Sequence, residues 1–259
     1  MPKSNWQPVD CHAHSTFSDG ALTIPEVIAR ARALGVRPSL SDHVSRDVAR
    51  SVASVEAVRA YLDALEQFDI FRGGEFCWHD NLWRELPVDV VRRFTHRLGS
   101  LHAVRMPNGS LVHAFSKRRP TGLTVDAYMN AHTESLEQLA REMPVDILAH
   151  PTLVTIPFRE VDLDELWTEA RETRMVEALY RAGIAFEISN RYWPHERLVR
   201  RAVARGVRFS LGSDGHTIDQ IAMVSRPLAL ARSLGVADTD LYDPSRHGSK
   251  AHDGVAVLS

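Results

Sequence analysis

Two histidines stand two residues apart near the start of the chain, in the segment Asp10-Cys11-His12-Ala13-His14. Side chains in an extended strand point alternately to opposite faces, so His12 and His14 share one face and can bind one metal ion. Asp214 and His216 repeat this spacing near the other end of the sequence. The two pairs therefore predict a metal site built from segments that are far apart in the chain.

Other short segments also end in a histidine or a carboxylate. One such histidine alone is more often a core residue than a ligand, but the joint pattern is hard to explain by chance. Imidazoles and carboxylates are ligands that zinc, manganese and iron accept, and the set contains no thiolate. Nine ligands are too many for one ion, so we expect two or three divalent ions, with Glu75 as a bridge between two of them. The nine predicted ligands are His12, His14, Asp19, His43, Glu75, His102, His150, Asp214 and His216.

Such a cluster favours the hydrolysis of phosphate esters. Divalent ions roughly 3.5–4 Å apart can hold a hydroxide nucleophile, neutralise phosphoryl oxygens and stabilise the leaving oxygen. We expect Asp214 and His216 to be catalytic. We expect Arg159, Asn190 and Arg191 to bind the substrate, because an arginine can hold a phosphate through two hydrogen bonds. The sequence contains neither a glycine-rich phosphate loop nor a Gly-x-Ser-x-Gly motif, so it does not predict P-loop or serine-hydrolase chemistry.

Three polar side chains close to the predicted ligands are expected to have other roles. Asp42 precedes His43 and is expected to cap a helix or to orient a neighbouring ligand. Glu187 ends a strand at the same rim and is left out of the ligand set, and Cys77 is expected to pack in the core. The remaining histidines lack such a context and are expected to be mostly surface or capping residues: His79, His96, His113, His132, His195, His247 and His252.

Signals for strand and helix alternate along the whole chain, which favours a parallel α/β fold. The segment around His12 is the first of seven expected strands, and the others lie at 36–41, near 74–75, and at 95–101, 145–149, 184–189 and 207–211. Helices are expected at 23–35, 54–68, 124–142, 163–182, 194–205 and 217–234. The predicted ligands follow the strands, so a barrel would gather them at the carboxyl rim, where the active sites of such barrels lie.

Size and composition favour a single domain over residues 1–237, followed by a polar tail at 238–259 that is loosely attached, with 255–258 able to dock. The 259 residues are 44% hydrophobic and 25% charged, as in ordinary globular proteins. A formal net charge of −2 gives no attraction to nucleic acid or membrane. The chain shows no leader peptide and no run of roughly 20 apolar residues, so a cytoplasmic location is expected. With only Cys11 and Cys77, no structural disulfide is expected.

Taken together, the motifs resemble those of the polymerase and histidinol phosphatase (PHP) family of metal-dependent phosphoesterases. The resemblance extends from Asp10 to about His216, and it implies a distorted seven-stranded β/α barrel. Ser41 stands where a threonine is common in the family, but every ligand position is retained. The motifs are His12-Ala13-His14, Ser18-Asp19-Gly20, Ser41-Asp42-His43, Gly74-Glu75, Gly99-Ser100-Leu101-His102, Ala149-His150-Pro151, Phe186-Glu187-Ile188-Ser189-Asn190 and Gly212-Ser213-Asp214-Gly215-His216.

The same resemblance implies how the ligands divide among three ions. Members of the family diverge between the motif that ends at His102 and the motif that begins at Ala149, which is the interval 103–148 here, so we expect the choice of substrate to depend on this interval. The first ion would be held by His12, His14, Glu75 and Asp214, the second by Asp19, His43 and His216, and the third by Glu75, His102 and His150.

The leading hypothesis is a phosphomonoesterase in which a metal-bridging hydroxide attacks a small phosphorylated substrate, with histidinol phosphate as the first candidate. One alternative is a nucleotide phosphatase or a 3'/5' exonuclease acting on phosphodiesters. Nucleic acid is not favoured as a partner, because the basic cluster at 117–119 lacks interleaved aromatic residues. A second alternative is a non-catalytic, metal-stabilised domain that binds a partner. No membrane partner is expected, and the sequence predicts no particular oligomeric state.

Overall fold

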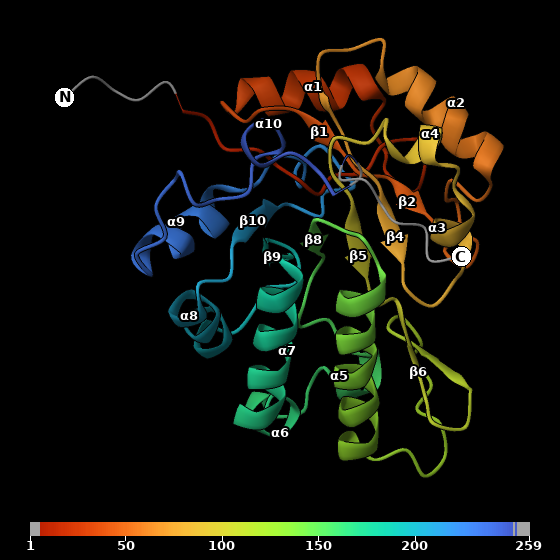
Figure 1. Cartoon of the computed structure of the whole chain (residues 1–259), viewed down its shortest axis with the longest axis vertical. Coiled ribbons are helices and arrows are strands. Elements are labelled where there is room, and N and C mark those ends of the chain that lie inside the picture. The colour runs from red at the N-terminus through yellow and green to blue at the C-terminus, as the bar shows by residue number, and fades with distance from the viewer. Residues whose placement is uncertain (1–5, 251, 253–259) are drawn as a thin grey trace.

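The computed structural model describes residues 6–250 and 252 and has a parallel sheet at its centre (Figure 1). Six strands pair in the order β10-β9-β8-β5-β4-β2, and all of these pairs are parallel. They are β2 (His43–Val44), β4 (Glu75–Cys77), β5 (Leu98–Ser100), β8 (Ile147–Leu148), β9 (Ala185–Ser189) and β10 (Phe209–Gly212). A second parallel pair, β1 (Ser39–Leu40) with β3 (Phe71–Arg72), directly precedes β2 and β4 in the chain. The expected parallel α/β fold is confirmed.

Residues 8–15 lie between the two edges of the six-stranded sheet. On one side, the Cys11 amide donates a hydrogen bond to the Leu211 carbonyl at 2.9 Å. On the other side, the Ser41 amide donates to the Ala13 carbonyl at 2.8 Å. Residues 8–15 thus hydrogen-bond to β10 on one side and to the stretch just before β2 on the other. This arrangement is in line with the distorted barrel that the PHP resemblance implies.

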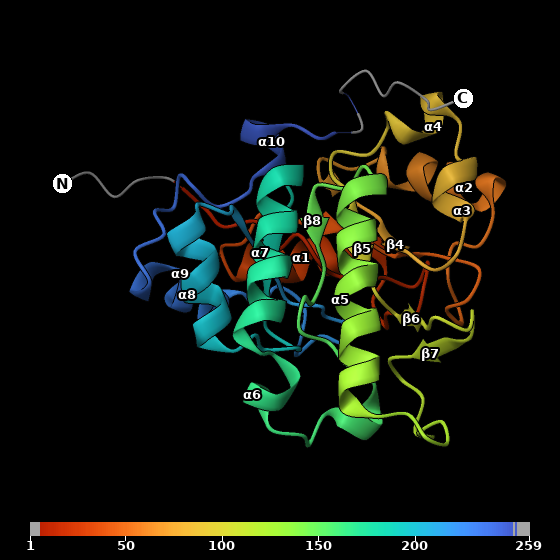
Figure 2. The ribbon, with the colours of Figure 1, turned by 60° about the horizontal axis from the view of Figure 1, so that its bottom comes forward.

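Helices cover the outside of the sheet (Figures 1 and 2), and α5 and α7 lie side by side with α8 packed against α7. The long helices are α1 (Ile24–Ala33), α2 (Val55–Leu65), α5 (Val125–Glu142), α7 (Glu169–Ala182), α8 (Glu196–Arg205) and α9 (Ser225–Ser233). Short helices are α3 (Leu82–Glu85), α4 (Val88–Val91), α6 (Leu163–Leu166), the 3-10 helix η1 (Ile156–Phe158) and α10 (Pro244–His247). None of the helices in the described part of the chain has the length and apolar character that a membrane crossing requires.

Local sequence explains where these helices begin, end and pack. Glu26 in the first turn of α1 accepts a hydrogen bond from the Thr23 amide at 2.8 Å, as in a capping box. Gly183 and Gly206 end α7 and α8 in the left-handed conformation, with φ of 61° and 82°. The buried residues of α2 recur every three or four positions, which gives one apolar face against the sheet: Val58, Tyr61, Leu62 and Leu65.

Three features differ from the expected elements. The helix expected at 217–234 begins only at Ser225, because Ala222 is held at φ 63° with its amide bonded to the buried carboxylate of Asp10 at 3.0 Å. The helix expected at 163–182 is divided, since the Thr168 side chain caps a new start and accepts from the Arg171 amide. A hairpin of β6 (Ala103–Arg105) and β7 (Leu111–His113), which the sequence did not predict, follows β5.

The start of the polar C-terminal segment packs against the barrel. The Tyr242 amide donates to the Phe209 carbonyl at 2.7 Å, and Asp243 pairs with Arg37 at 2.6 Å. Ser249 donates to the buried Asp146 at 2.7 Å. The expectation of a loosely attached tail is therefore wrong for 238–250, while the expected docking of 255–258 lies outside the described residues.

Candidate metal centre

The structure brings all nine predicted ligands together in one cluster. His12 and His14 come from the segment 8–15, and Asp19 comes from the loop that follows it. His43 opens β2 and Glu75 opens β4, and the other predicted ligands follow β5, β8 and β10. Each of the nine has a donor atom in at least one group of three or four whose donor atoms lie within 4.8 Å of one another.

Glu75 lies at the centre of this cluster and is fully buried. Its Oε1 is 2.9 Å from His150 Nε2 and 3.1 Å from His102 Nε2. Its Oε2 faces the opposite way, at 3.4 Å from His12 Nε2. The two oxygens thus point into different groups of imidazoles, which is the arrangement that a carboxylate bridging two metal ions requires.

The two histidines of the first segment meet Asp214 from the last strand end. The Oδ1 atom of Asp214 lies 3.7 Å from His12 Nε2 and 3.3 Å from His14 Nε2. All three side chains are buried. The same-face spacing of His12 and His14 therefore produces the convergence that it predicts.

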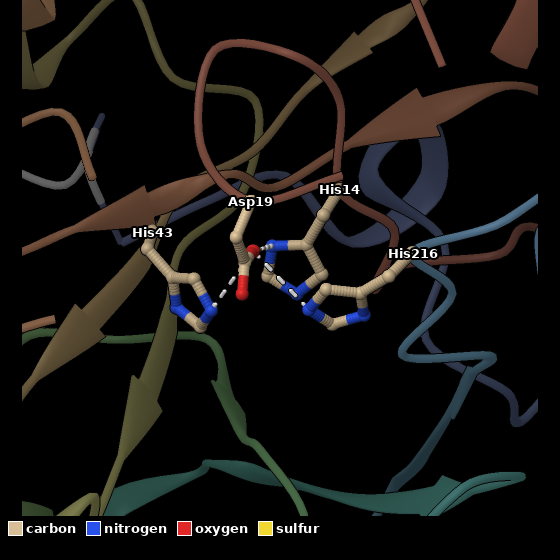
Figure 3. A group of neighbouring side chains, drawn as sticks. All are labelled: His14, Asp19, His43 and His216. Carbon is tan, nitrogen blue, oxygen red and sulfur yellow. Dashed lines mark ion pairs between the residues drawn. The ribbon is translucent and has the colours of Figure 1, made fainter. Parts of the chain in front are cut away.

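An outer group surrounds Asp19 and consists of His14, His43 and His216 (Figure 3). Asp19 Oδ1 lies 3.2 Å from His216 Nε2, 3.5 Å from His43 Nε2 and 4.0 Å from His14 Nδ1. The side chain of Asp19 is 30% exposed and that of His216 is 16% exposed. This group forms the entrance to the cluster, above the buried carboxylate of Glu75.

Several buried donor atoms of the cluster make no hydrogen bond within the described part of the chain. Leaving a buried polar atom without a partner costs about 1–3 kcal/mol, so such atoms are uncommon and need an explanation. Imidazole nitrogen and carboxylate oxygen atoms that converge on one point and have no hydrogen-bond partner fit the coordination of divalent metal ions. The atoms are His12 Nε2, His14 Nε2, Asp19 Oδ1, His43 Nδ1 and Glu75 Oε2.

The carboxylates of the cluster stay ionised despite their burial. Burial alone would raise the pKa of Glu75, but the charges of His102 and His43 hold it well below its usual range. Burial also opposes ionisation of Asp214, whose pKa is lowered by the charge of His12 and by the adjacent ring of His14. Asp19 shows the same pattern, with its pKa lowered by the adjacent rings of His216 and His43. The three carboxylates are therefore ionised and can serve as ligands for cations.

The histidines respond to burial in two ways. Burial lowers the pKa of His14 to about 3, and the neighbouring charge of His43 adds to this effect. Burial also disfavours the charged form of His43, but Glu75 and Asp19 raise its pKa to about 10. In the absence of metal ions, protons on rings such as His43 offset the charge of the carboxylates. Metal ions would replace these protons, because only a deprotonated ring nitrogen can be a ligand.

Buried polar groups around the cluster hold the ligands in place. Glu187 Oε1 lies 2.8 Å from His12 Nδ1, which leaves Nε2 of that ring facing the cluster. Asp42 accepts from the hydroxyls of Ser15 and Ser18 at 2.8 and 2.6 Å, so it fixes the loop that carries Asp19. Asp42 therefore supports the cluster from outside the ligand set, as one of its two expected roles, but it acts on the loop that carries Asp19 rather than on His43.

Asp10 ties the first segment of the barrel to the last. It accepts from the amide and the hydroxyl of Ser213 at 2.8 and 2.6 Å. Burial raises the pKa of Asp10 to about 6, although the hydrogen bonds from Ser213 oppose this effect. No role for Asp10 was predicted from the sequence, because its partner Ser213 lies near the other end of the chain.

Cys77 is buried, as expected, but it also contacts a predicted ligand. Its Sγ lies 3.0 Å from His102 Nδ1, on the side of the ring away from Glu75. The thiol thus helps to set the orientation of the His102 ring. In the sequence, this contact is signalled by the position of Cys77 two residues after Glu75, which places both side chains on the same face of β4.

Two predicted ligands have unusual backbone conformations. His150 and Asp214 have positive φ values of 32° and 49°. Residues other than glycine rarely adopt this region, and such strain is found most often at functional sites.

At Gly212 an added Cβ would lie 1.8 Å from Glu187 Oε1, so only glycine leaves room for the carboxylate that holds His12.

A pocket of about 400 Å³ opens above the cluster. Arg191, Phe115 and Tyr192 line it together with six predicted ligands, which are Asp19, His43, His102, His150, Asp214 and His216. The Tyr192 ring is 5.5 Å from that of His150, and the Phe115 ring is 5.8 Å from that of His102. The sequence analysis missed both aromatic residues, since neither belongs to a motif that would have marked it.

Of the three predicted substrate contacts, the structure brings only Arg191 into this pocket. Arg159 lies behind the lining: its guanidinium donates to the carbonyls of Val154 and Ala114 at 3.1 and 3.2 Å, and it is 5.6 and 5.7 Å from the ring centroids of Phe115 and Tyr192. Asn190 is also absent from the lining.

The remaining histidines do not all follow the expectation. His195 caps α8, as expected of a capping residue. His96 and His132 are instead buried, where burial lowers the pKa of each to about 4. His113 lines the pocket, and the ring of His79 packs against the ring of His113.

Comparison with known proteins gives both sequence and structural relatives. The chain is 26% identical over 235 residues to the DNA polymerase/3'-5' exonuclease PolX of Bacillus subtilis (strain 168). The match covers 86% of this chain but only 36% of that protein's length. No model of a protein family matches the chain.

Two solved structures share the fold. Histidinol phosphate phosphatase from Lactococcus lactis, in complex with zinc, L-histidinol and phosphate, superposes with a TM-score of 0.72 at 15% identity. The alignment covers 95% of this chain and 98% of that one. A Listeria monocytogenes protein, provisionally named a histidinol phosphatase, gives a TM-score of 0.71 at 15% identity and covers 85% of this chain and 99% of its own. The chain therefore has the fold of these proteins, in agreement with the PHP resemblance.

Proposed function

We propose that this protein is a metal-dependent phosphoesterase that hydrolyses a small phosphate monoester, with histidinol phosphate as the first candidate substrate. The observation that carries the proposal is the cluster of nine imidazole and carboxylate side chains, with five buried donor atoms that make no hydrogen bond to the described residues. The cluster opens onto a pocket of about 400 Å³, a size that suits a small ligand. The fold shared with a protein bound to zinc, L-histidinol and phosphate supports the same reading.

The donor groups suit three ions with shared ligands, as the PHP resemblance implies. Bound there, divalent ions would activate water and offset the negative charge of the phosphoryl oxygens. Nitrogen and oxygen donors of this kind accept zinc, manganese and iron. We assign His12, His14, Glu75 and Asp214 to the first ion, Asp19, His43 and His216 to the second, and Glu75, His102 and His150 to the third.

Arg191 is the side chain best placed to bind the phosphate group. It lines the pocket, with a guanidinium nitrogen 2.7 Å from His216 Nδ1 and 3.4 Å from the Asp214 carbonyl oxygen. A guanidinium donates two parallel hydrogen bonds to a phosphate, which fixes the orientation of the ester. Asp214 and His216 also line the pocket and contact Arg191, so we propose that they are the catalytic residues.

Tyr192 and Phe115 give the pocket an apolar side, and their rings lie 6.5 Å apart. This side would contact the organic part of the ester and exclude bulk water from it. In hydrolysis, water adds to phosphorus, the bond between phosphorus and the ester oxygen breaks, and the alcohol leaves with a proton.

The proposal is tested by measuring phosphate release from histidinol phosphate and from a nucleoside monophosphate, and nucleotide release from a short oligonucleotide, in parallel with zinc- or manganese-loaded protein. We expect turnover of histidinol phosphate to be the fastest. Turnover of none of the three at full metal occupancy would contradict the assignment as a phosphoesterase.

A second candidate function is the cleavage of phosphodiesters. It is favoured by the 26% identity to a protein named as a DNA polymerase/3'-5' exonuclease. Faster turnover of the oligonucleotide than of histidinol phosphate in the same experiment would support this alternative. Both functions use the same cluster, so the outcome changes the substrate and leaves the proposed ligands as they are.

A further inference from the structure

A second group of possible ligands lies beside the nine-residue cluster and shares none of its members. It consists of Asp47, His79 and His113, whose donor atoms lie within 4.8 Å of one another. Asp47 Oδ2 is 2.7 Å from His79 Nε2 and 3.2 Å from His113 Nδ1. The two rings meet edge to face, with centroids 5.8 Å apart. Two imidazoles therefore converge on one carboxylate oxygen, although a single ion pair needs only one of them.

The fold places these three residues at the mouth of the pocket. Asp47 follows β2, His79 follows β4, and His113 ends β7 of the unexpected hairpin. Asp47 and His113 line the pocket together with His43 and His102 of the main cluster. The hairpin thus brings one additional histidine to the rim.

The chemistry of the three side chains suits a zinc-class ion. Two imidazoles and one carboxylate form a common three-ligand set for divalent metals, with the remaining positions open to water or another ligand. Burial lowers the pKa of His79, although the hydrogen bond with Asp47 opposes this effect, so its ring is neutral near pH 7 and able to bind metal. The carboxylate of Asp47 is 41% exposed, so a simple ion pair there would contribute little to stability.

We propose that Asp47, His79 and His113 bind one further divalent ion at the mouth of the pocket, with its open coordination positions facing the pocket. This site binds more weakly than the main cluster for two reasons. It is more exposed, with 45% exposure at the His113 side chain. In addition, His79 Nδ1 is buried without a hydrogen-bond partner among the described residues, whereas a ligating histidine is usually oriented through its second nitrogen.

The test is the number of zinc ions bound per chain, measured by equilibrium dialysis and elemental analysis of the full-length protein. We expect H113Q and D47N each to bind one zinc ion fewer than the unchanged protein at saturation. The matched control is H252Q, because His252 is exposed and lies outside the pocket lining. Thermal unfolding of each variant checks that it is folded, and the exposed position of His113 makes H113Q the variant least prone to misfold.

The readout does not depend on hydrolysis, so it separates this site from the proposed function. Equal zinc content in H113Q, D47N and the unchanged protein would overturn the proposal, as would an equal loss in H252Q. Anomalous diffraction at the zinc edge from crystals soaked in zinc locates the ion directly. A peak between Asp47, His79 and His113 supports the site, and peaks confined to the nine-residue cluster overturn it.

Discussion

Two buried glutamates of this protein have the same exposure but different surroundings. Glu75 in the metal centre and Glu172 between α7 and α8 are both 0% exposed. The oxygens of Glu172 accept from the guanidinium groups of Arg197 at 2.9 Å and Arg201 at 3.2 Å. Glu75 is surrounded by imidazoles, and its Oε2 makes no hydrogen bond to any described residue.

The difference shows how a structural ion cluster can be distinguished from a set of metal ligands. Arginine is always charged and provides the hydrogens that satisfy a buried carboxylate. Imidazole can lose its proton and then offers a lone pair to a metal ion. A buried carboxylate paired with arginines stabilises the fold, whereas one surrounded by histidines with unpaired nitrogens is suited to bind a cation.

The largest effect is expected from replacing each glutamate by glutamine. Glu75→Gln should lower phosphate release by about 1000-fold, since metal ions contribute several kcal/mol to the stabilisation of the transition state. Glu172→Gln should leave the rate unchanged and lower the free energy of unfolding by about 1–3 kcal/mol. Steady-state kinetics and urea denaturation check the pair. The same loss of activity in both variants would remove the distinction between the two regions.

The next effect concerns pH. In metal-free protein the pKa of His43 is about 10, so its ring is protonated at pH 7 and must lose that proton to bind metal. Zinc affinity should therefore rise by about tenfold per pH unit for each proton displaced between pH 6 and 8. Calorimetry in buffers of different ionisation enthalpy measures the number of protons released. Zinc binding without proton release at pH 7 would contradict this assignment.

The same shift has a consequence for the stability of the metal-free protein. Because the pKa of His43 is raised on folding, its contribution to stability is fully present below the unfolded value of 6.5 and is lost as the pH rises through about 10. His14, with its pKa lowered to about 3, acts in the opposite sense and only below about pH 6.5. The free energy of unfolding of the metal-free protein should therefore fall as the pH rises from 7 to 10. Urea denaturation of protein treated with a chelator measures this change, to which rings with raised pKa values contribute and His14 does not.

A smaller effect is expected at Glu187, which contacts His12 rather than the pocket. Glu187→Gln should weaken zinc binding by about 10–100-fold, because the carboxylate fixes the orientation of the His12 ring. Zinc affinity measured by competition with a chelator is the readout, with Glu172→Gln as the buried control. If both variants bind zinc equally well, the contact with His12 is structural only.

The sequence was sufficient to predict the nine residues of the cluster and the parallel α/β fold. Most of the predicted ligands begin a strand or follow one by a few residues, and a parallel sheet brings such positions to one rim. His12 and His14 lie instead in the segment 8–15, which makes only isolated bridges, and Asp19 lies in the loop that follows it. The nine residues were therefore predicted from short local motifs, and the topology of the fold brings these motifs together.

Other features depended on contacts between distant residues. Arg159 does not line the pocket because backbone carbonyls of Val154 and Ala114 hold its guanidinium. The helix expected from 217 starts late because Asp10 holds the Ala222 amide. Asp47, His79 and His113 were not grouped from the sequence, because no hairpin was predicted there, although Asn108-Gly109 between β6 and β7 is a recognisable turn signal.

The central claim is that the nine-residue cluster is a metal centre that hydrolyses a phosphate ester. The most direct test is a zinc titration of chelated protein in which bound zinc and phosphate release from histidinol phosphate are measured on the same sample. The account predicts that release is absent without zinc, rises as the cluster fills and is lost again on chelation. Phosphate release that does not change with bound zinc, or full zinc binding without any release, would contradict it.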